Sequence, residues 1–166
     1  DHTHADAVVT ITNTPGGMIR FSPVSSSITD CTGATDVAVT IDDATGITAF
    51  DFTVNYPPAV VSLPVVVGGA LVSDCSVVTN IPVAGTLLVS ISCTTPRSGG
   101  GTLLDLTFQG VANGGVSSNL TVTSCSLDEG AIPCSSVPGD ITLNLRFTLM
   151  EHVPVDASWP SEGGPR

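Results

Sequence analysis

Five cysteines are the residues of this 166-residue chain whose chemistry is easiest to anticipate. No two of them form the CxxC pair typical of zinc sites, so we expect disulfide bonds, which indicate an oxidising compartment. Cys75 and Cys93 flank what reads as a hairpin or two neighbouring strands, and Cys125 and Cys134 enclose a loop of eight residues. We expect these two pairs to be bonded and Cys31 to be unpaired or to pair between molecules. Five cysteines with one left over also allow other pairings.

Acidic residues are the second set that could do chemistry, because clustered carboxylates bind divalent cations. Fifteen Asp and Glu residues face four Arg and no Lys, and the net charge is −11. Asp42 and Asp43 lie in a turn that can bring neighbouring oxygens together, so they are candidate calcium ligands, with an ordinary Asx turn as the alternative. Calcium is the candidate cofactor, and no cofactor is certain. The acidity favours solubility and argues against nucleic acid or anionic membrane surfaces as partners.

Catalytic motifs are absent from the sequence, which contains no GxSxG, no HExxH and no phosphate-binding glycine loop. The three histidines, His2, His4 and His152, lie in the two atypical ends, where a solvated terminus is the simplest interpretation. Asp128 and Glu129 are adjacent, so a strand would point them to opposite faces. A loop or turn role is therefore expected for them rather than an acid–base pair, and we expect the protein not to be an enzyme.

Alternation of apolar and polar residues predicts the elements that must position these side chains. It recurs from end to end, and it indicates strands with one buried face and one wet face, as in antiparallel sheets. In one such run Leu103 is expected to point outward, opposite Leu104. Turn residues separate the runs, and about ten short strands at this spacing predict a β-sandwich. The residues expected to point inward are Val37, Val39, Ile41, Phe50, Phe52, Val54, Tyr56, Leu87, Val89, Ile91, Leu104, Leu106, Phe108, Ile141, Leu143, Leu145, Phe147 and Leu149.

The chain reads as one domain with two distinct ends. Residues 1–17 hold one strand-like run, 7–13, followed by a Thr-Pro-Gly-Gly hinge, residues 18–149 hold the sandwich, and residues 150–166 form a tail rich in Pro, Gly, Ser and acid. The chain starts without a basic-then-apolar signal segment, so we expect a mature secreted form, extracellular or at the cell surface. The longest apolar stretch, residues 60–72, is too short to span a bilayer, and membrane insertion is not expected.

Three segments in the middle of the chain resemble the cohesin family. Residues 46–63, which read GITAFDFTVNYPPAVVSL, are similar to its pattern of a strand, a turn after tyrosine and a second strand. Residues 101–108 resemble the next hallmark, and residues 125–133 with 139–143 resemble the closing loop and last strand. The resemblance covers residues 19–145. It implies an all-β jelly-roll sandwich of about nine strands, here with an extra N-terminal strand, and a docking role, since cohesins receive dockerin domains on one sheet face.

Two functions follow from these observations. The first is a secreted, non-enzymatic structural protein that assembles with other copies of itself into an extracellular filament or tube. Residues 7–13 would then add to the sheet of a neighbour, with Ala7, Val9 and Ile11 in the neighbour's core. The lack of lysine fits this hypothesis, because lysine commonly protects edge strands from pairing. The alternative is a cohesin module that binds a dockerin-bearing protein.

A carbohydrate-binding module is the less favoured third function. Sugar-binding faces generally present flat aromatic side chains. The two candidates for this role are Tyr56, which lies on the apolar face of its strand, and Trp159, which lies in the tail. Neither position offers an exposed platform on the sandwich.

Overall fold

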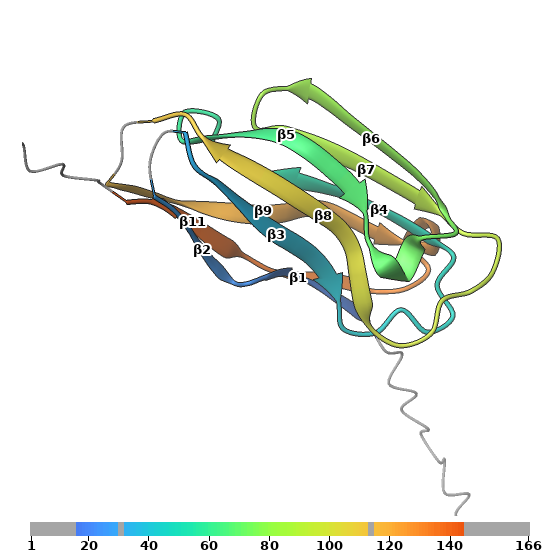
Figure 1. Cartoon of the computed structure of the whole chain (residues 1–166). Helices are drawn as coiled ribbons and strands as arrows, with labels where there is room; N and C mark the ends of the chain where they lie inside the picture. Colours follow the sequence, from blue (N-terminus) through green and yellow to red (C-terminus); the bar gives the residue numbers. More distant parts are fainter. Residues whose placement is uncertain (1–15, 30–31, 113–114, 145–166) are drawn as a thin grey trace, which may run out of the picture.

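The computed structural model describes residues 16–29, 32–112 and 115–144. These residues form two mixed sheets packed as a sandwich, with two short 3-10 turns (Figure 1). The five-stranded sheet has the order β10-β1-β3-β8-β5, and the six-stranded sheet has the order β2-β11-β9-β4-β7-β6. The elements are β1 (Gly17–Ser22), β2 (Ser25–Ile28), β3 (Ala34–Ile41), β4 (Ala49–Asn55), β5 (Val61–Gly68), η1 (Ala70–Val72), β6 (Ser76–Val83), β7 (Thr86–Ser92), β8 (Gly101–Gly110), β9 (Val116–Leu127), η2 (Asp128–Gly130), β10 (Cys134–Val137) and β11 (Gly139–Leu143).

Two corners carry the chain from one sheet to the other and raise the number of strands. β1 leads through Pro23 into β2, and β10 leads through Pro138 into β11. β1 and β10 pair in parallel in one sheet, and β2 and β11 pair in parallel in the other. Proline lacks the N–H that a ladder needs, so each run stops there and continues in the opposite sheet. The described part therefore has eleven strands where about nine were expected.

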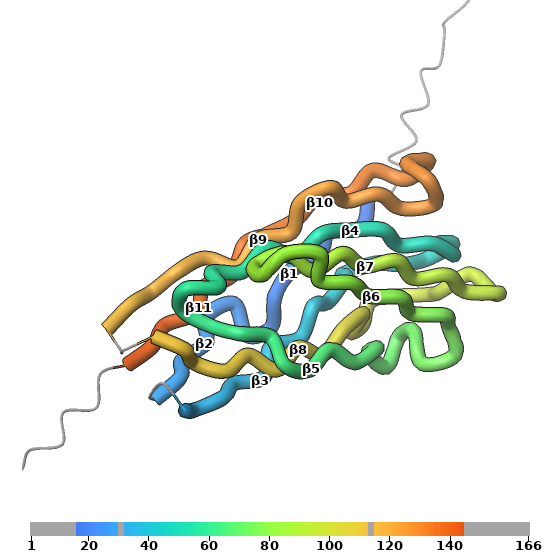
Figure 2. The backbone as a smooth tube through the Cα atoms, turned by 90° about the horizontal axis from the view of Figure 1, so that it is seen from above, coloured from blue at the N-terminus to red at the C-terminus, as the bar shows by residue number. Residues whose placement is uncertain are grey.

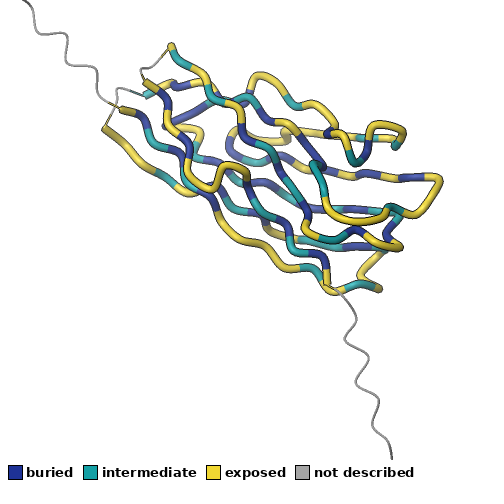
Figure 3. Tube along the Cα trace, turned by 60° about the horizontal axis from the view of Figure 1, so that its bottom comes forward, coloured by how far each residue is buried: buried dark blue, intermediate teal, exposed yellow. Residues whose placement is uncertain are grey.

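Inward-facing side chains from both sheets fill one core, and the predicted sandwich is confirmed. β4 shows the alternation most clearly, with Phe50, Phe52 and Val54 buried between partly exposed neighbours. Figure 3 shows buried and exposed positions alternating along the chain in both layers of the sandwich. The core is large enough to hold the fold by apolar burial, which contributes roughly 25 cal/mol per Å² of apolar surface removed from water.

Leu103 departs from the expected alternation, and the prediction that it points outward is wrong. It is fully buried, like its neighbour Leu104. The register between β3 and β8 shifts at this point, because Val39 pairs with Leu104 whereas Thr40 pairs with Thr102. Such a bulge inserts one extra residue into β8 and re-aims its side chain. Two successive leucines are thereby brought into the core.

Two disulfide bonds join the two cysteine pairs that were expected from the sequence. The Cα–Cα distance is 4.4 Å between Cys75 and Cys93 and 5.8 Å between Cys125 and Cys134. The first bond links the start of β6 to the end of β7, and the second closes the loop that contains η2 and links β9 to β10. Cys31 lies outside the described residues.

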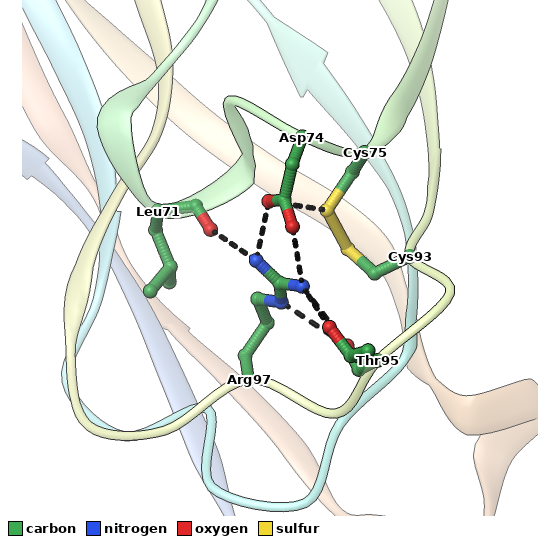
Figure 4. Close-up of polar contacts among 6 residues, drawn as sticks. All are labelled: Leu71, Asp74, Cys75, Cys93, Thr95 and Arg97. Carbon is green, nitrogen blue, oxygen red and sulfur yellow. Dashed lines mark hydrogen bonds and ion pairs between the residues drawn. A yellow bond between two sulfur atoms is a disulfide. The ribbon is translucent and has the colours of Figure 1, made fainter.

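Arg97 holds together the loops beside the first disulfide (Figure 4). Its guanidinium donates two hydrogen bonds to the carboxylate of Asp74, at 2.6 and 3.1 Å. It also donates to the carbonyl oxygen of Leu71 and to the carbonyl and hydroxyl oxygens of Thr95. The Arg97 side chain is only 12% exposed. All its partners belong to the loops themselves, so this charged cluster has a structural role.

Candidate protein-binding surface

The outer face of β9, β4, β7 and β6 brings together side chains from four strands, and we call it the β4–β7 face. Residues directly opposite each other in antiparallel strands project to the same side of a sheet, so the pairing register defines rows across this face. Two central rows are Thr123–Thr53–Leu88–Asn80 and Ser126–Asp51–Ser90–Val78. Most of these side chains are short, so the face is low and broad.

Leu88 and Val78 form the apolar centre of the β4–β7 face. They are 42% and 62% exposed, and together with Asp51, Asn80 and Ser90 they line an open depression of about 250 Å³. Three of the ten exposed large hydrophobic residues of the described chain, Val78, Val83 and Leu88, project to this face from β6 and β7. Exposed apolar side chains gathered in this way, rather than scattered singly, mark an interaction surface.

Hydroxyl and amide groups surround this apolar centre. The side-chain amide of Asn55 donates to the Thr123 hydroxyl at 2.8 Å, which orders the polar side chains where β4 meets β9. Asp51 is the one charged residue in the two central rows. Apolar contacts in the middle and hydrogen-bonding groups around them are the usual anatomy of a protein–protein interface.

Asp128 lies in η2 beside this face, and the structure gives it a structural role. Its Oδ1 accepts hydrogen bonds from the backbone N–H and hydroxyl of Thr48, both at 2.9 Å, and from the N–H of Ala49 at 2.8 Å. Partial burial raises the pKa of this carboxyl, but the three donors outweigh that effect and hold the pKa below its usual value. Asp128 therefore ties η2 to the start of β4, and the exposed Glu129 does not join it in a pair.

The candidate calcium ligands lie in the loop after β3, where their oxygens accept N–H groups. Oδ1 of Asp42 accepts the backbone N–H of Met18 at 2.7 Å and of Asp43 at 3.0 Å. Oδ1 of Asp43 accepts the N–H of Thr45 at 2.9 Å, which is the geometry of an Asx turn. Within the described ranges no three acidic, histidine or cysteine side chains lie close enough to hold a metal ion.

Aromatic side chains do not contribute to any outer face of the described sandwich. Tyr56 is buried, with its ring edge-on to Phe108 at 5.7 Å between centroids. The described phenylalanines are buried as well. The part of the chain that the structure describes therefore has no exposed aromatic platform on which a sugar ring could stack.

Several residues singled out from the sequence lie outside the described residues. They are Ala7, Val9 and Ile11 of the proposed assembly strand, the expected inward-pointing Leu145, Phe147 and Leu149, and Cys31, Trp159, His2, His4 and His152.

No helix in the described ranges is long and apolar enough to cross a bilayer.

Sequence reasoning missed the residues that define the β4–β7 face. Leu88 lies on the polar side of an alternating run, and its exposure follows from the pairing of β7 with β4 and β6. β6 was expected only as part of a hairpin or a pair of strands between Cys75 and Cys93, because its apolar residues do not alternate regularly with polar ones. Its β-branched residues and its lack of charge are the signal that could have indicated an edge strand.

Comparisons with known proteins find likeness in the fold. Neither protein-family models nor curated proteins match the chain by sequence. A non-cellulosomal cohesin from the hyperthermophilic archaeon Archaeoglobus fulgidus matches with a TM-score of 0.67 and 18% identity, over 78% of this chain and 91% of that one. A cohesin from Clostridium acetobutylicum matches with a TM-score of 0.66 and 20% identity, over 79% and 92%. A type I cohesin–dockerin complex from Clostridium thermocellum matches with a TM-score of 0.67 and 14% identity, over 78% and 99%.

Proposed function

Because the chain has a cohesin-like fold, as its three sequence segments predicted, we propose that it is a non-enzymatic docking module that binds a dockerin-type partner on the β4–β7 face. Solved structures of similar fold are described as cohesin–dockerin complexes, and that description supports the class of partner. The observation that carries the proposal is the depression around Leu88 and Val78, open at the centre of a four-stranded surface.

The chemistry of this surface favours a partner with an apolar ridge. One or two aliphatic side chains of the partner would fill the depression, while its polar groups would meet the surrounding Ser, Thr and Asn side chains. The net charge of −11 would speed association with a partner of positive potential and disfavour acidic partners. Asp51 would accept a hydrogen bond from a basic or hydroxyl group at the margin of the contact.

The compartment follows from the cysteine chemistry. Disulfide bonds persist in oxidising environments, and the described part of this chain has two of them. Both bonds support a location outside the cell or at the cell surface, where a docking module would meet secreted partners.

Calorimetric titration tests the proposal with the dockerins of the solved Clostridium thermocellum, Clostridium acetobutylicum and Acetivibrio cellulolyticus complexes. We expect at least one to bind with micromolar or tighter affinity. Leu88→Lys should weaken that binding at least tenfold, about 1.4 kcal/mol, because it places a charge in the apolar centre. Val67→Lys is the matched control, since Val67 is 54% exposed on β5 of the other sheet. Failure of every dockerin to bind, or a loss of binding in Val67→Lys alone, would contradict the proposal.

A further inference from the structure

β6 is a free edge of the six-stranded sheet. It pairs with β7 on one side and is the last strand in the sheet order, so the described part of the chain supplies no strand on its other side (Figure 1). Of its eight residues only Val77 is partly buried, and the other seven are exposed. The backbone of β6 is therefore accessible along the whole strand.

The hydrogen-bond pattern tells which backbone groups of β6 face outward. Cys93, directly after β7, donates its N–H to the carbonyl oxygen of Thr48, so odd-numbered residues of β7 bond to β4. Because bonding alternates along an antiparallel strand, the even-numbered residues of β7 bond to residues 76, 78 and 80 of β6. The N–H and C=O groups that point away from β7 are then those of Val77, Thr79 and Ile81.

Most of this edge lacks the charges, prolines and bulges that protect edge strands, because Pro82 and a register shift between Asn80 and Val83 interrupt β6 only near its end. β6 has no charged residue, and Val78, Ile81 and Val83 are 62%, 40% and 62% exposed. The other edges offer shorter uninterrupted runs, because β2 and β10 have four residues each, and Pro64 with a register shift between Ser62 and Val65 divides β5. Long, uncharged edges are the ones that pair with additional strands. β6 is therefore the edge of this sandwich best able to accept another strand.

A strand added to β6 would also cover apolar side chains between the two sheets. Val77 and Thr79 pair with the buried Ile91 and Val89, so they lie on the side of β6 that faces the other sheet, and Ile81 follows them in the alternation before the register shift. Val77 contacts the backbone of β5 at Gly68, and Val66 of β5 is likewise partly buried against the core. Ile81 remains 40% exposed. We call these three apolar side chains the seam, and alternate apolar side chains of an added strand would cover it.

The chain's own residues 7–13 have the pattern of such a strand, but they cannot reach their own β6. Gly17 starts β1 in the five-stranded sheet and lies against Leu127 at the end of β9. A strand beyond β6 would be four strand spacings from β9, roughly 19 Å, and one sheet-to-sheet distance from β1, roughly 10 Å. The four residues from residue 13 to Gly17 span at most about 14 Å, which is shorter than the distance that the strand would have to cover. Figure 2 shows β10, the neighbour of β1, on the opposite side of the sandwich from β5.

We propose that the free edge of β6 accepts residues 7–13 of a second copy of this chain as an added strand. The backbone groups of Val77, Thr79 and Ile81 would bond to the incoming strand. Its Ala7, Val9 and Ile11 would cover the seam, and its Val8, Thr10 and Thr12 would face outward. The donor segment and the accepting edge are different parts of the molecule, so the contact is head-to-tail, does not close on itself and extends into a filament.

Two complementary variants of the full chain test this proposal by light scattering and negative-stain microscopy. Thr79→Pro removes one outward N–H and leaves the ladder with β7 intact, so it disables the accepting edge. Val9→Asp puts a charge on the inward side of the donor strand, and Val8→Asp is the matched control on its outward side. We expect filaments from the parent and from Val8→Asp, and monomers from Thr79→Pro and from Val9→Asp. An equimolar mixture of the two monomeric variants should form dimers, because each supplies the half that the other lacks.

Three results would overturn the proposal: a monomeric parent, filaments from either disabled variant, or a mixture that remains monomeric. Circular dichroism checks folding, and Thr79→Lys, which keeps the N–H but charges the edge, replaces Thr79→Pro if that chain does not fold. Dockerin binding is measured separately with the Leu88→Lys variant, which alters the β4–β7 face and leaves the backbone edge of β6 unchanged. The failure of one proposal is thus distinguishable from the failure of the other.

Discussion

One carboxylate oxygen joins the turn after β9 to the start of β4. Asp128 has a backbone φ of 44°, in the left-handed region that Asp and Asn adopt more readily than most residues. This conformation aims its Oδ1 at Thr48 and Ala49, eighty and seventy-nine residues earlier in the sequence. This oxygen accepts three hydrogen bonds, so removing the Asp128 carboxylate would leave the backbone N–H groups of Thr48 and Ala49 without partners.

Replacing Asp128 with alanine is expected to lower the free energy of unfolding by about 2–4 kcal/mol. Unpaired, partly buried N–H groups cost about 1–3 kcal/mol each, partly relieved here by water. Glu129→Ala is the matched control, because Glu129 has a similar left-handed backbone with φ of 57° but is exposed. Urea unfolding measures both variants. Equal losses in the two would show that backbone conformation, and not the hydrogen bonds, explains the effect.

Acid should destabilise the fold below about pH 4. The pKa values of Asp43, Asp74 and Asp128 lie below the usual 3.8. Hydrogen bonds from Thr45 lower the pKa of Asp43, and hydrogen bonds from Arg97 lower that of Asp74. Burial raises the pKa of Asp128, but hydrogen bonds from Thr48 and Ala49 outweigh that effect. The unfolded state therefore binds more protons in this range, so stability is fully present above the unfolded pKa and is lost as pH falls through the folded values. Unfolding curves at several pH values measure the slope, and Asp128→Asn should make it shallower. A slope of opposite sign would refute the assignment.

At the scale of elements, the first disulfide fits its place in the ladder. Cys75 and Cys93 continue the register of β6 and β7 and lie opposite each other at a pair that does not exchange hydrogen bonds. Such pairs have Cα atoms about 4.5 Å apart, close to the 4.4 Å found here. The bond pins the start of an edge strand that has only one neighbour, whereas the Cys125–Cys134 bond acts on a different edge of the sandwich.

Removing the first disulfide should loosen β6 selectively. The double variant Cys75→Ser with Cys93→Ser opens a link across 18 residues, worth about 3 kcal/mol in the chain-entropy model. We expect a lower melting temperature, a chain still folded at room temperature, and faster amide exchange at residues 76, 78 and 80. The matched control removes Cys125 and Cys134, which should leave exchange in β6 unchanged. Unchanged exchange in the first variant would mean that packing alone holds the strand.

At the scale of the whole molecule, two surfaces meet at β6. The outer side of the strand contributes Val78 and Asn80 to the β4–β7 face, while its backbone edge points sideways along the sheet. A docking partner and an added strand would therefore bind side by side without competing for the same atoms. The added strand would join copies that carry the same high negative charge.

Salt should strengthen self-assembly. Each copy carries a net charge of −11, so copies repel one another, and the screening length falls from about 30 Å at 0.01 M salt to about 8 Å at 0.15 M. Light scattering across this range should show larger particles at higher salt. Thr79→Pro, as the control, should remain monomeric throughout. Assemblies that dissolve when salt is added would indicate contacts between opposite charges instead of a shared strand.

Much of the fold could be predicted because local pattern and burial agree. The alternation of Phe50, Phe52 and Val54 already requires one buried face, and the structure buries that face. Leu103 shows the limit, since its burial depends on a bulge created where β8 meets β3. The cysteine pairs could be expected because Cys75 and Cys93 flank an expected hairpin and Cys125 and Cys134 enclose a short loop. Leu88 could not be assigned a role, because a leucine at an outward position gives no sign of what surrounds it.

The sequence by itself determined the class of fold, its single core, its acidity and its disulfide chemistry, since these depend on composition and on spacing within short segments. Only the tertiary structure decided which residues share a surface. Leu88, Val78 and Asp51 come from three strands, and the register between those strands, formed by backbone bonds between distant segments, places them around one depression. The free edge of β6 has the same origin, because a strand becomes an edge only when the order of all the strands in its sheet is settled.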